Sequence, residues 1–598
     1  MDYTIFDIEG NGLLHEITKI WTFSYGMYRG KELLASGTLT DPDEIKSFVL
    51  KQSILVGHKI IEYDVPALEK VLGIKITAQL IDTLGISFYH YPVKGFVHGL
   101  AAWGERFHFP KPVIAENEWL GPLEGESWKE FIDKMTNRCE SDVEINTRLF
   151  HFQMEYTMAI YDEDIGQVLR LFRYLGYKLD CLREQEAEKI KLDVRLTEKS
   201  KIDLEFIIDE KITNLSKHMP RILHKEQPKI MYKKNGDLSS HGLKWNALLK
   251  LKNLPLGTTK ITKSGSPTSP VQLKDWLFSL GWEPVTFKVN KKEEKIPQVS
   301  LPFGAGLCPS VVSMFDKYEY LEELGGLYRA RHRFGLFKSF LENKDEQDYI
   351  YSRAQGFTNT LRLQHAKPVA NLPGVDKYYG KEVRGCLTVP DESYIMCGSD
   401  ISGLEDNTKQ HYIYFYDPDY VTDMRVPGFD PHIDIAVLAE MITKEDEEFY
   451  KRIDKDKEVL GKDFSFENEV EAKRFKNIKT IRGKAKVVNF SATYGAGAPK
   501  IAETLKCDLA FASKLHKTYW KRNSAVKKTA KDCKVKIVDA QKWLYNPVSG
   551  FWMFLKAEKD RFSTLNQSTG VYVFDTWLRK VRTKLNPLGI RVCMQYHD

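Results

Sequence analysis

The stretch "IRGKAKVVNFSATYGAG", residues 481–497, places two cations and two aromatic rings at every fourth position. These residues are Arg482, Lys486, Phe490 and Tyr494. A step of four residues advances about 40° around an α-helix, so the four side chains share one broad face. The cations at one end would suit a phosphate group, and the rings at the other end a flat base. An amphipathic helix with two core aromatics has the same pattern. Gly495 and Gly497 predict that the helix ends directly after Tyr494.

Length and composition indicate a globular protein of several domains. The chain has 598 residues, more than one hydrophobic core usually organises, and 42% of them are hydrophobic and 28% charged. We find no apolar run that would span a bilayer, and the first residues do not resemble a signal peptide. The 8 cysteines are dispersed without a CxxC pair. We therefore expect a soluble protein of the reducing cytoplasm, with no membrane contact and no structural zinc.

Positive charge is concentrated in residues 211–264. This segment has twelve Lys or Arg against two acids, an excess of ten, so the remainder of a chain with a total of +6 is net −4. Such a segment suits a phosphate backbone better than an acidic protein partner, although a solvated helix face has a similar composition. The candidate phosphate contacts are Lys233, Lys234 and Lys244.

Hydrophobic periodicity divides the rest of the chain. Residues 1–155 alternate strand-like and helix-like runs, which is typical of an α/β unit. Further helices are expected over 160–215, from Val271, over 318–341 and from near Thr480. A highly charged stretch, 444–479, precedes the last of these helices, and its role is open.

Four carboxylates stand out in the α/β unit. Asp7 and Glu9 lie two apart on a strand, so their side chains leave the same face, while Asp64 and Asp142 lie where helix patterns begin. Converging carboxylates repel one another unless they hold divalent metal. Two metal ions about 4 Å apart activate water and stabilise the leaving oxygen in phosphodiester hydrolysis. Because single acids are usually just solvated, the hypothesis depends on all four.

The chain ends on "RVCMQYHD", residues 591–598. Residues 591–596 contain apolar and aromatic side chains and no breaker, which is typical of a buried strand. A second strand-like run, "SYIMCGSD", ends at Asp400, with Glu405 five residues further on. Composition alone does not explain why a core strand would end on His597 and Asp598.

The N-terminal region resembles the proofreading 3′-5′ exonuclease domain of family A DNA polymerases, particularly the phage replicative ones. The segments that carry the resemblance are "FDIEGNGLL" (6–14), "GHKIIEYDVPAL" (57–68), "IDTL" (81–84) and "HGLAAWGERF" (98–107). It implies a ribonuclease H-like fold, with Asp7, Glu9, Asp64 and Asp142 as ligands of two Mg²⁺ ions. The family form has Tyr four residues, or His five residues, before the last Asp to orient water. Arg138 and Asn137 stand there in this chain. A guanidinium cannot act as a base, so either another group orients the water or the activity is weak.

The 481–497 stretch resembles the fingers helix of the same family, whose form is R-xxx-K-xxx-F/Y-xxx-Y-G. The resemblance implies that Arg482 and Lys486 bind the phosphates of an incoming dNTP. It implies further that Phe490 packs on its sugar and base and that Tyr494 lies beside the templating base. "DPHIDIA" (430–436) resembles another fingers segment, which makes His432 a candidate phosphate contact.

"CGSDISGLE" (397–405) and the final His-Asp resemble the two carboxylate motifs of the polymerase palm. The resemblance implies that Asp400 and Asp598 hold two Mg²⁺ ions, and that Glu405 lies under the sugar where a 2′-OH would clash. His597 would face the primer terminus. The second motif normally continues with Glu and a return strand, so we expect a truncated palm that extends primers poorly unless a second polypeptide completes it.

Shorter segments resemble DNA contacts of the family. "TLRLQHAKPVANLPG" (360–374) and "KEVRGCL" (381–387) imply primer-template contacts for Arg362 and Arg384, and "TLNQSTG" (564–570) implies a minor-groove contact for Gln567. The expected fold is a multidomain α/β and α+β protein, a ribonuclease H-like exonuclease domain followed by thumb, palm and fingers. Its expected domains are exonuclease 1–155, thumb 156–345, palm 346–430, fingers 431–577 and palm return 578–598.

We therefore expect a template-directed DNA polymerase with a proofreading exonuclease. Its partners would be primer-template DNA and dNTPs, with a processivity factor or a second polymerase fragment as further candidates. Two alternatives stay open at this point. One is a single-subunit RNA polymerase, and the other is a DNA-binding exonuclease subunit with an incomplete palm.

Overall fold

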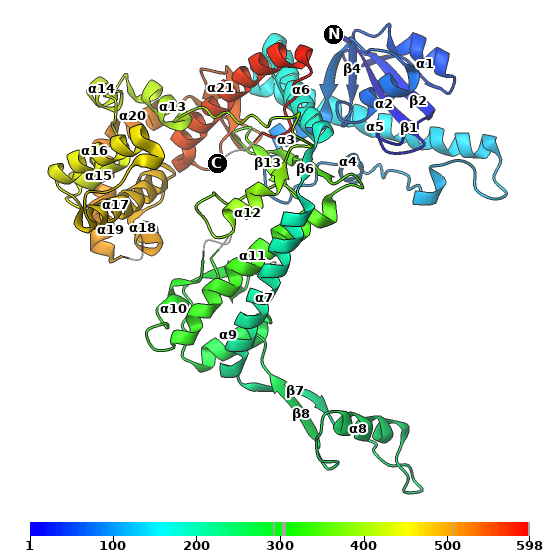
Figure 1. Cartoon of the computed structure of the whole chain (residues 1–598). Coiled ribbons are helices and arrows are strands. Elements are labelled where there is room, and N and C mark those ends of the chain that lie inside the picture. Colours follow the sequence, from blue (N-terminus) through cyan, green and yellow to red (C-terminus); the bar gives the residue numbers. More distant parts are fainter. Residues whose placement is uncertain (291–292, 302–305, 506, 596–598) are drawn as a thin grey trace. The chain divides into compact units, whose positions relative to one another are not determined.

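The computed structural model describes residues 1–290, 293–301, 306–505 and 507–595, and the chain divides into two compact units (Figure 1). Unit 1 consists of Met1–Lys189, Tyr351–Ala370 and Cys397–Asp598, and unit 2 of Ile190–Ile350 and Asn371–Met396. In the part of the chain that the structure describes, no helix is long and apolar enough to cross a membrane. His597 and Asp598 lie outside the described residues.

Unit 1 begins with a five-stranded sheet of order β3-β2-β1-β4-β5. Its strands are β1 (Asp2–Gly10), β2 (Ile20–Arg29), β3 (Glu32–Leu39), β4 (Ile54–Gly57) and β5 (Gln79–Asp82). β2 pairs antiparallel with β1 and β3, whereas β4 pairs parallel with β1 and β5. The consecutive residues Ile5 and Phe6 are both buried, so both faces of β1 are covered. The α/β pattern expected from the sequence is confirmed here.

The helices of this region are α1 (Pro42–Val49), α2 (Asp64–Leu72), α3 (Thr83–His90), α4 (Leu100–Arg106), α5 (Trp128–Ile160) and α6 (Ile165–Glu188). α5 packs against β1 and β2. The prediction that a helix starts near Asp142 is wrong, because α5 starts at Trp128 with a capping box formed by Ser127 and Glu130. The early turns were missed because their apolar stripe is narrow: Phe131, Met135 and Cys139 are buried at every fourth position among polar residues.

A second sheet joins the C-terminal part of unit 1 to this first region. It has the order β15-β16-β17, with β15 (Val535–Val538), β16 (Gln541–Asn546) and β17 (Phe551–Phe554). Trp543 and Trp552 belong to the same buried core as β1. The Tyr89 hydroxyl of α3 donates a hydrogen bond of 2.5 Å to the Trp552 carbonyl. The remaining elements of this part are β12 (Arg353–Phe357), β13 (Leu363–Ala366) and α21 (Arg561–Leu585).

The other helices of unit 1 are α13 (Leu404–Ile413), α14 (Pro418–Met424), α15 (Pro431–Leu438), α16 (Lys444–Leu460), α17 (Glu469–Thr493), α18 (Ala498–Leu505), α19 (Leu509–Arg522) and α20 (Ser524–Asp532). The prediction that α17 begins near Thr480 is wrong, since the helix begins at Glu469 behind the side-chain cap of Asn468. The charged stretch 444–479 forms α16 and the first half of α17, and Tyr450 stacks on Phe475 with ring centroids 5.1 Å apart. α17 ends at Thr493, and Gly495 follows at φ 78°, as the sequence predicted.

In unit 2, the long helices α7 (Val194–His218) and α11 (Glu322–Asn343) pack along each other (Figure 1). The basic segment forms the hairpin of β7 (Arg221–Glu226) and β8 (Lys260–Ser264) together with α8 (Ser240–Leu251). Trp245 of α8 is buried in a small core of its own. The other elements of unit 2 are β6 (Ile190–Leu192), α9 (Pro270–Ser279), β9 (Phe287–Val289), β10 (Lys295–Pro297), α10 (Pro309–Val312), β11 (Tyr349–Ile350), α12 (Gly380–Gly385) and β14 (Leu387–Thr388).

Two expected strands do not form in the described residues. Neither 394–401 nor 591–595 has strand structure, so Asp400 does not lie at the end of a strand. A strand requires a neighbouring strand to take up its backbone hydrogen bonds. The amides of Val592 and Gln595 instead donate to the side chains of Glu184 and Gln185, at 3.3 and 3.1 Å.

A buried ion pair ties α6 to α21 and gives a prediction for stability. The Lys178 ammonium lies 2.7 Å from Asp575, and their side chains are 3% and 4% exposed. Replacing Asp575 by Ala leaves a buried ammonium unpaired and should cost about 3–5 kcal/mol in the free energy of unfolding. The pair Lys178→Met with Asp575→Leu should regain most of that loss. Urea unfolding followed by tryptophan fluorescence measures both.

Glu155→Ala, which breaks an exposed ion pair with Lys31, is the matched control and should change stability by about 0.5 kcal/mol or less. A loss for Asp575→Ala as small as that of this control would contradict the prediction.

Candidate active sites

The structure brings three of the four N-terminal carboxylates together. Asp7 and Glu9 leave one face of β1, and Asp142 reaches them from α5, with oxygen atoms of all three within 4.8 Å of one another. Asp64, the first residue of α2, lies beside them and is buried. Its carboxylate accepts hydrogen bonds from its own amide and from the amide of Ile8. The strand period of two places Asp7 and Glu9 on one face, as the sequence predicted, whereas Asp64 and Asp142 are supplied by the helices α2 and α5.

Burial controls the charge of this carboxylate cluster (Asp7, Glu9, Asp64 and Asp142). Burial and then the charge of Asp142 raise the pKa of Glu9 to about 8. Burial raises the pKa of Asp64 to about 7, and burial with the neighbouring acids raises the pKa of Asp7 well above its ordinary value. Acids placed this way retain protons near neutrality unless a cation offsets their charge.

Two cations reach into the carboxylate cluster. The Lys111 ammonium forms an ion pair with Asp142, and Arg138 Nε lies 3.3 Å from Glu9 Oε1 and 3.6 Å from Asp142 Oδ2. Arg138 Nη1 also donates to the carbonyl of Pro112, which fixes the loop that carries Lys111. Arg138 stands where the family form has a tyrosine, and the structure shows it in ion pairs. Lys111 was missed by sequence reasoning, since its only signal is a position between two prolines.

The carboxylate cluster fits a hard divalent cation. Carboxylate oxygens are the ligands that Mg²⁺ and Mn²⁺ prefer. Asp142 Oδ1 is buried and has no hydrogen-bond partner among the described residues, which leaves one oxygen available to a ligand. A buried carboxylate oxygen without a partner is costly, and a bound cation would remove that cost.

The second site is a cavity of about 390 Å³ beside α17. It is lined by Arg362, Asp400, Glu405, Lys486, Phe490 and Gln567, among others. Phe490 is 39% exposed, so a flat ligand can reach its ring. The Lys486 ammonium lies 5.7 Å from the centre of that ring. Six side chains that the sequence proposed for one site thus meet at one cavity.

Glu405 is held from three directions at this cavity. The Tyr494 hydroxyl donates a 2.5 Å hydrogen bond to its Oε2, and Arg362 lies 3.4 Å from its Oε1. Asn566 Nδ2 donates to the Glu405 carbonyl at 3.0 Å. The two oxygens of the carboxylate therefore have separate partners, which fixes its direction.

Two predicted phosphate contacts, Arg482 and His432, have partners within the protein and are not among the residues that line this cavity. Arg482 Nε is 2.5 Å from Asp430, the N-cap of α15, and His432 on the same helix shares a 2.9 Å hydrogen bond with Asn489. Burial lowers the pKa of His432 to about 4, so it is neutral at pH 7. Asp430 was missed by sequence reasoning; its signal is the Asp-Pro pair that begins α15.

The remaining predicted contacts lie in unit 2. Arg384 Nε donates to the Pro373 carbonyl at 2.7 Å. Lys233, Lys234 and Lys244 are exposed on the β7–α8–β8 segment.

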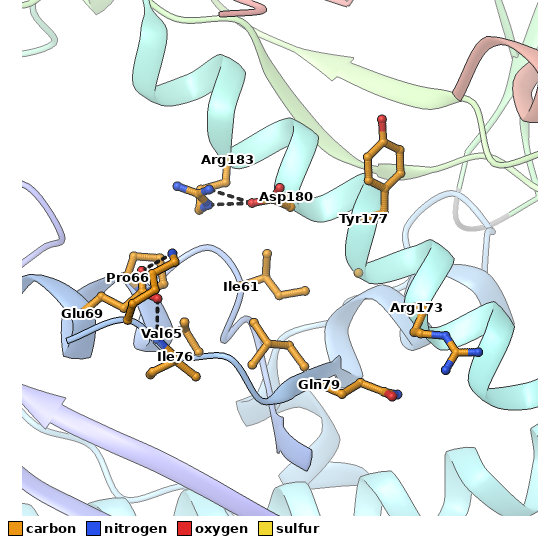
Figure 2. Close-up of a pocket in the computed structure, with 13 residues that line it drawn as sticks. Ile61, Val65, Pro66, Glu69, Ile76, Gln79, Arg173, Tyr177, Asp180 and Arg183 are labelled. Atoms are coloured by element: carbon orange, nitrogen blue, oxygen red, sulfur yellow. Dashed lines mark hydrogen bonds and ion pairs between the residues drawn. The ribbon is translucent and has the colours of Figure 1, made fainter. Parts of the chain in front are cut away.

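A further cavity has a volume of about 320 Å³ and is lined mainly by residues of α2, β5 and α6 (Figure 2). Four of its charged side chains are paired with one another: Arg183 donates to Asp180 at 2.7 Å, and Lys75 lies 2.9 Å from Glu69. Because these charges are already offset, the carboxylate cluster and the α17 cavity are the stronger candidate sites.

Comparisons with known proteins agree over nearly the whole chain. The DNA-directed DNA polymerases of Enterobacteria phage T3 and Escherichia phage T7 are each 20% identical over 685 aligned positions, covering 98% of this chain and 90% of the relative. The fold is similar to that of the polymerase domain of Pol1 from M. smegmatis, solved in complex with DNA primer-template and dNTP. That likeness has a TM-score of 0.62 at 14% identity and covers 100% of this chain and 88% of the other. No family model matches the chain.

The chain is similar to phage DNA-directed DNA polymerases along nearly all of its length. The alignment covers 98% of this chain, so the N-terminal sheet and the α17 region both lie within the similarity. The structure departs from the family form at Arg138, which is in ion pairs, and at Asp406 and Asn407, which follow Glu405.

The raised pKa values predict how stability depends on pH without metal. In the folded chain the pKa of Glu9 is about 8 and the pKa of Asp64 is about 7. In the unfolded chain a carboxyl group has a pKa of about 4. The unfolded chain therefore binds fewer protons between these values, and the free energy of unfolding should fall as pH rises from about 4 to 8. Melting temperatures measured in EDTA across this range test it.

Mg²⁺ should reduce the loss of stability at higher pH, because the bound cation offsets the carboxylate charges in place of the protons. Glu9→Gln should also reduce it, while the exposed-site control Glu16→Gln should not. A melting temperature that rises from pH 5 to 8 in EDTA for every variant would contradict the prediction.

Proposed function

We propose that this chain is a template-directed DNA polymerase that extends a primer with dNTPs and proofreads with a 3′-5′ exonuclease. The observation that carries the proposal is the α17 cavity, where Lys486 and Phe490 face Asp400 and Glu405. The relatives are phage DNA-directed DNA polymerases, and the structural neighbour was solved with primer-template and dNTP. These relatives do not favour a single-subunit RNA polymerase. A phage-encoded enzyme of this kind would act in the host cytoplasm.

In the polymerase site, the proposed residues divide into metal, phosphate and sugar contacts. Asp400, with Asp598, would hold two Mg²⁺ ions, which lower the pKa of the primer hydroxyl and offset charge on the leaving pyrophosphate. Lys486 lines the cavity and would bind a phosphate of the incoming nucleotide, and Arg482 would join it when released from Asp430. Glu405, fixed by Tyr494, would exclude a 2′-hydroxyl beneath Phe490.

The exonuclease proposal depends on the carboxylate cluster and the sheet beneath it. The strand order β3-β2-β1-β4-β5, antiparallel in its first half and parallel in its second, supports a ribonuclease H-like domain. Asp7, Glu9 and Asp142 would hold Mg²⁺, which activates water for attack on the terminal phosphodiester. Because Arg138 is paired with Glu9 and Asp142, it would bind and orient the phosphate but not deprotonate the water.

DNA would be held by contacts that do not read sequence. Arg362 and Gln567 line the α17 cavity, where they can reach acceptors in the minor groove of the primer-template. The exposed lysines of the basic segment, Lys233, Lys234 and Lys244, would bind backbone phosphates. A processivity factor would be a further partner of this segment.

Separate substitutions should remove the two activities one at a time. Asp7→Ala with Glu9→Ala removes ligands of the first centre and should abolish degradation of a primer 3′ end without weakening DNA binding. Asp400→Asn should abolish dNTP incorporation and leave degradation intact. Each variant is the control for the other, and gel assays on one labelled primer-template measure both reactions. Degradation that persists in the double variant would overturn the exonuclease assignment, and incorporation that persists in Asp400→Asn would overturn the polymerase assignment.

Sugar selection should depend on Glu405 and Phe490. Glu405→Ala removes the carboxylate beside the nucleotide and should admit ribonucleotides, raising their incorporation relative to dNTPs about 10-fold or more, because one good steric or hydrogen-bonding contact accounts for roughly 1–3 kcal/mol. Phe490→Tyr adds a hydroxyl that can stand in for a missing 3′-OH, so dideoxynucleotides should be used better. Asp406→Asn is the neighbouring control for Glu405. Unchanged ratios of kcat/KM for ribo- and deoxynucleotides in Glu405→Ala would contradict this placement of the sugar.

A further inference from the structure

Lys111 is a cation held inside the proposed exonuclease centre. Its side chain is 20% exposed, and its ammonium forms an ion pair with Asp142, whose side chain is 3% exposed. Asp142 has an oxygen atom within 4.8 Å of oxygen atoms of Asp7 and Glu9. The ammonium therefore lies beside the carboxylate cluster.

The loop that carries Lys111 is fixed at this position. Pro110 and Pro112 flank the lysine and restrict its backbone. The Pro112 carbonyl accepts a hydrogen bond from Arg138, which belongs to α5, one helical turn before Asp142. The guanidinium of Arg138 also packs over the Trp119 ring at 5.8 Å. The same helix thus supplies the metal ligand and the group that holds the lysine loop above it.

The charges of this centre do not match two divalent ions. The four carboxylates of the cluster carry −4 when ionised, which two divalent ions would offset completely. Metal ligation requires ionised carboxylates, and Lys111 and Arg138 then supply +2, which leaves the ionised cluster at −2. Before a phosphate binds, one divalent ion offsets that charge, whereas a second would leave a net charge of +2 in a buried site, where unpaired charge is costly.

The oxygen atoms of the cluster are also distributed for one ion. The three carboxylates with oxygens within 4.8 Å of one another are Asp7, Glu9 and Asp142. The Asp64 carboxylate is engaged by the amides of Asp64 and Ile8. Asp142 pairs with Lys111 through Oδ2, and its Oδ1 is buried without a hydrogen-bond partner among the described residues. One oxygen of Asp142 is therefore available to a metal while the other keeps the lysine.

We propose that the exonuclease centre binds a single divalent metal ion and that the Lys111 ammonium supplies the positive charge of the second, an inference that rests on the proposed exonuclease function. An ammonium has three donors and can bind a phosphate oxygen as a point charge, as a metal ion would. Lys111 then contributes charge to the reacting phosphate, and Asp142 holds it in place.

Mn²⁺ binding to the full chain tests this directly, because Mn²⁺ accepts the same oxygen ligands as Mg²⁺ and has an electron paramagnetic resonance signal. For each chain, the number of Mn²⁺ ions bound at this centre is the number bound by that chain minus the number bound by the same chain with Asp7→Ala and Glu9→Ala. The compared chains are the natural sequence, Lys111→Met, Lys111→Arg and the control Lys129→Met, an exposed lysine on α5. Two ions about 4 Å apart give a spin-coupled spectrum, and one ion gives an isolated one.

We expect one uncoupled Mn²⁺ in the natural sequence, in Lys111→Arg and in Lys129→Met, and two coupled ions in Lys111→Met. Two coupled ions in the natural sequence, with 3′-end degradation intact, would overturn this inference and leave the proposed exonuclease standing. One ion in every chain would overturn the role of Lys111. No bound ion and no degradation would overturn the proposed exonuclease itself.

Discussion

The shared core under the two sheets is the contact on which the rest of unit 1 depends. Trp543 and Trp552 of the second sheet are buried in the same core as Ile5 and Phe6 of β1. Tyr89 adds a hydrogen bond to the Trp552 carbonyl, so its polar atom is satisfied inside this core. Burying such large rings contributes several kcal/mol each by the usual area estimate, about 25 cal/mol per Å². The core therefore holds two candidate catalytic centres, far apart in sequence, within one compact unit.

Electrostatic repulsion between buried acids is the main constraint on the carboxylate cluster. A strand that directs Asp7 and Glu9 toward Asp142 creates a cluster of buried like charges, and burial raises their pKa values. Lys111 and Arg138 reduce that cost in the folded chain without filling every oxygen. The protein thus tolerates the cluster before a ligand arrives, which explains why a lysine lies among the predicted metal ligands.

Sequence reasoning succeeded where a short period fixes the geometry. The helix spacing that joins Lys486, Phe490 and Tyr494, and the strand spacing of Asp7 and Glu9, place these side chains without knowledge of tertiary contacts. It failed where the decisive partner is distant in sequence. Lys111 pairs with a residue 31 positions away and Arg482 with one 52 positions away, and neither pairing leaves a local pattern.

Contacts with residues distant in sequence also explain the wrong predictions of helix and strand boundaries. α17 begins earlier than expected because its first turns are stabilised by packing of Phe475 on Tyr450, while its composition is mostly charged. The apolar run 591–595 has strand propensity, but its amides bond to side chains of α6, and propensity cannot form a strand without a neighbouring strand.

Both candidate centres hold their cations in ion pairs before any ligand is bound. Lys111 is paired with Asp142, Arg482 with Asp430 and Arg362 with Glu405. At the α17 cavity, a phosphate that takes Arg482 or Arg362 must release Asp430 or Glu405. At the carboxylate cluster, Asp142 can keep Lys111 on Oδ2 while Oδ1 accepts a metal ion, so both positive charges can act on one phosphate there, and metal and phosphate binding are coupled favourably. The coupling needs no movement of the sheets or helices, since it is contained in the separate contacts of the two Asp142 oxygens.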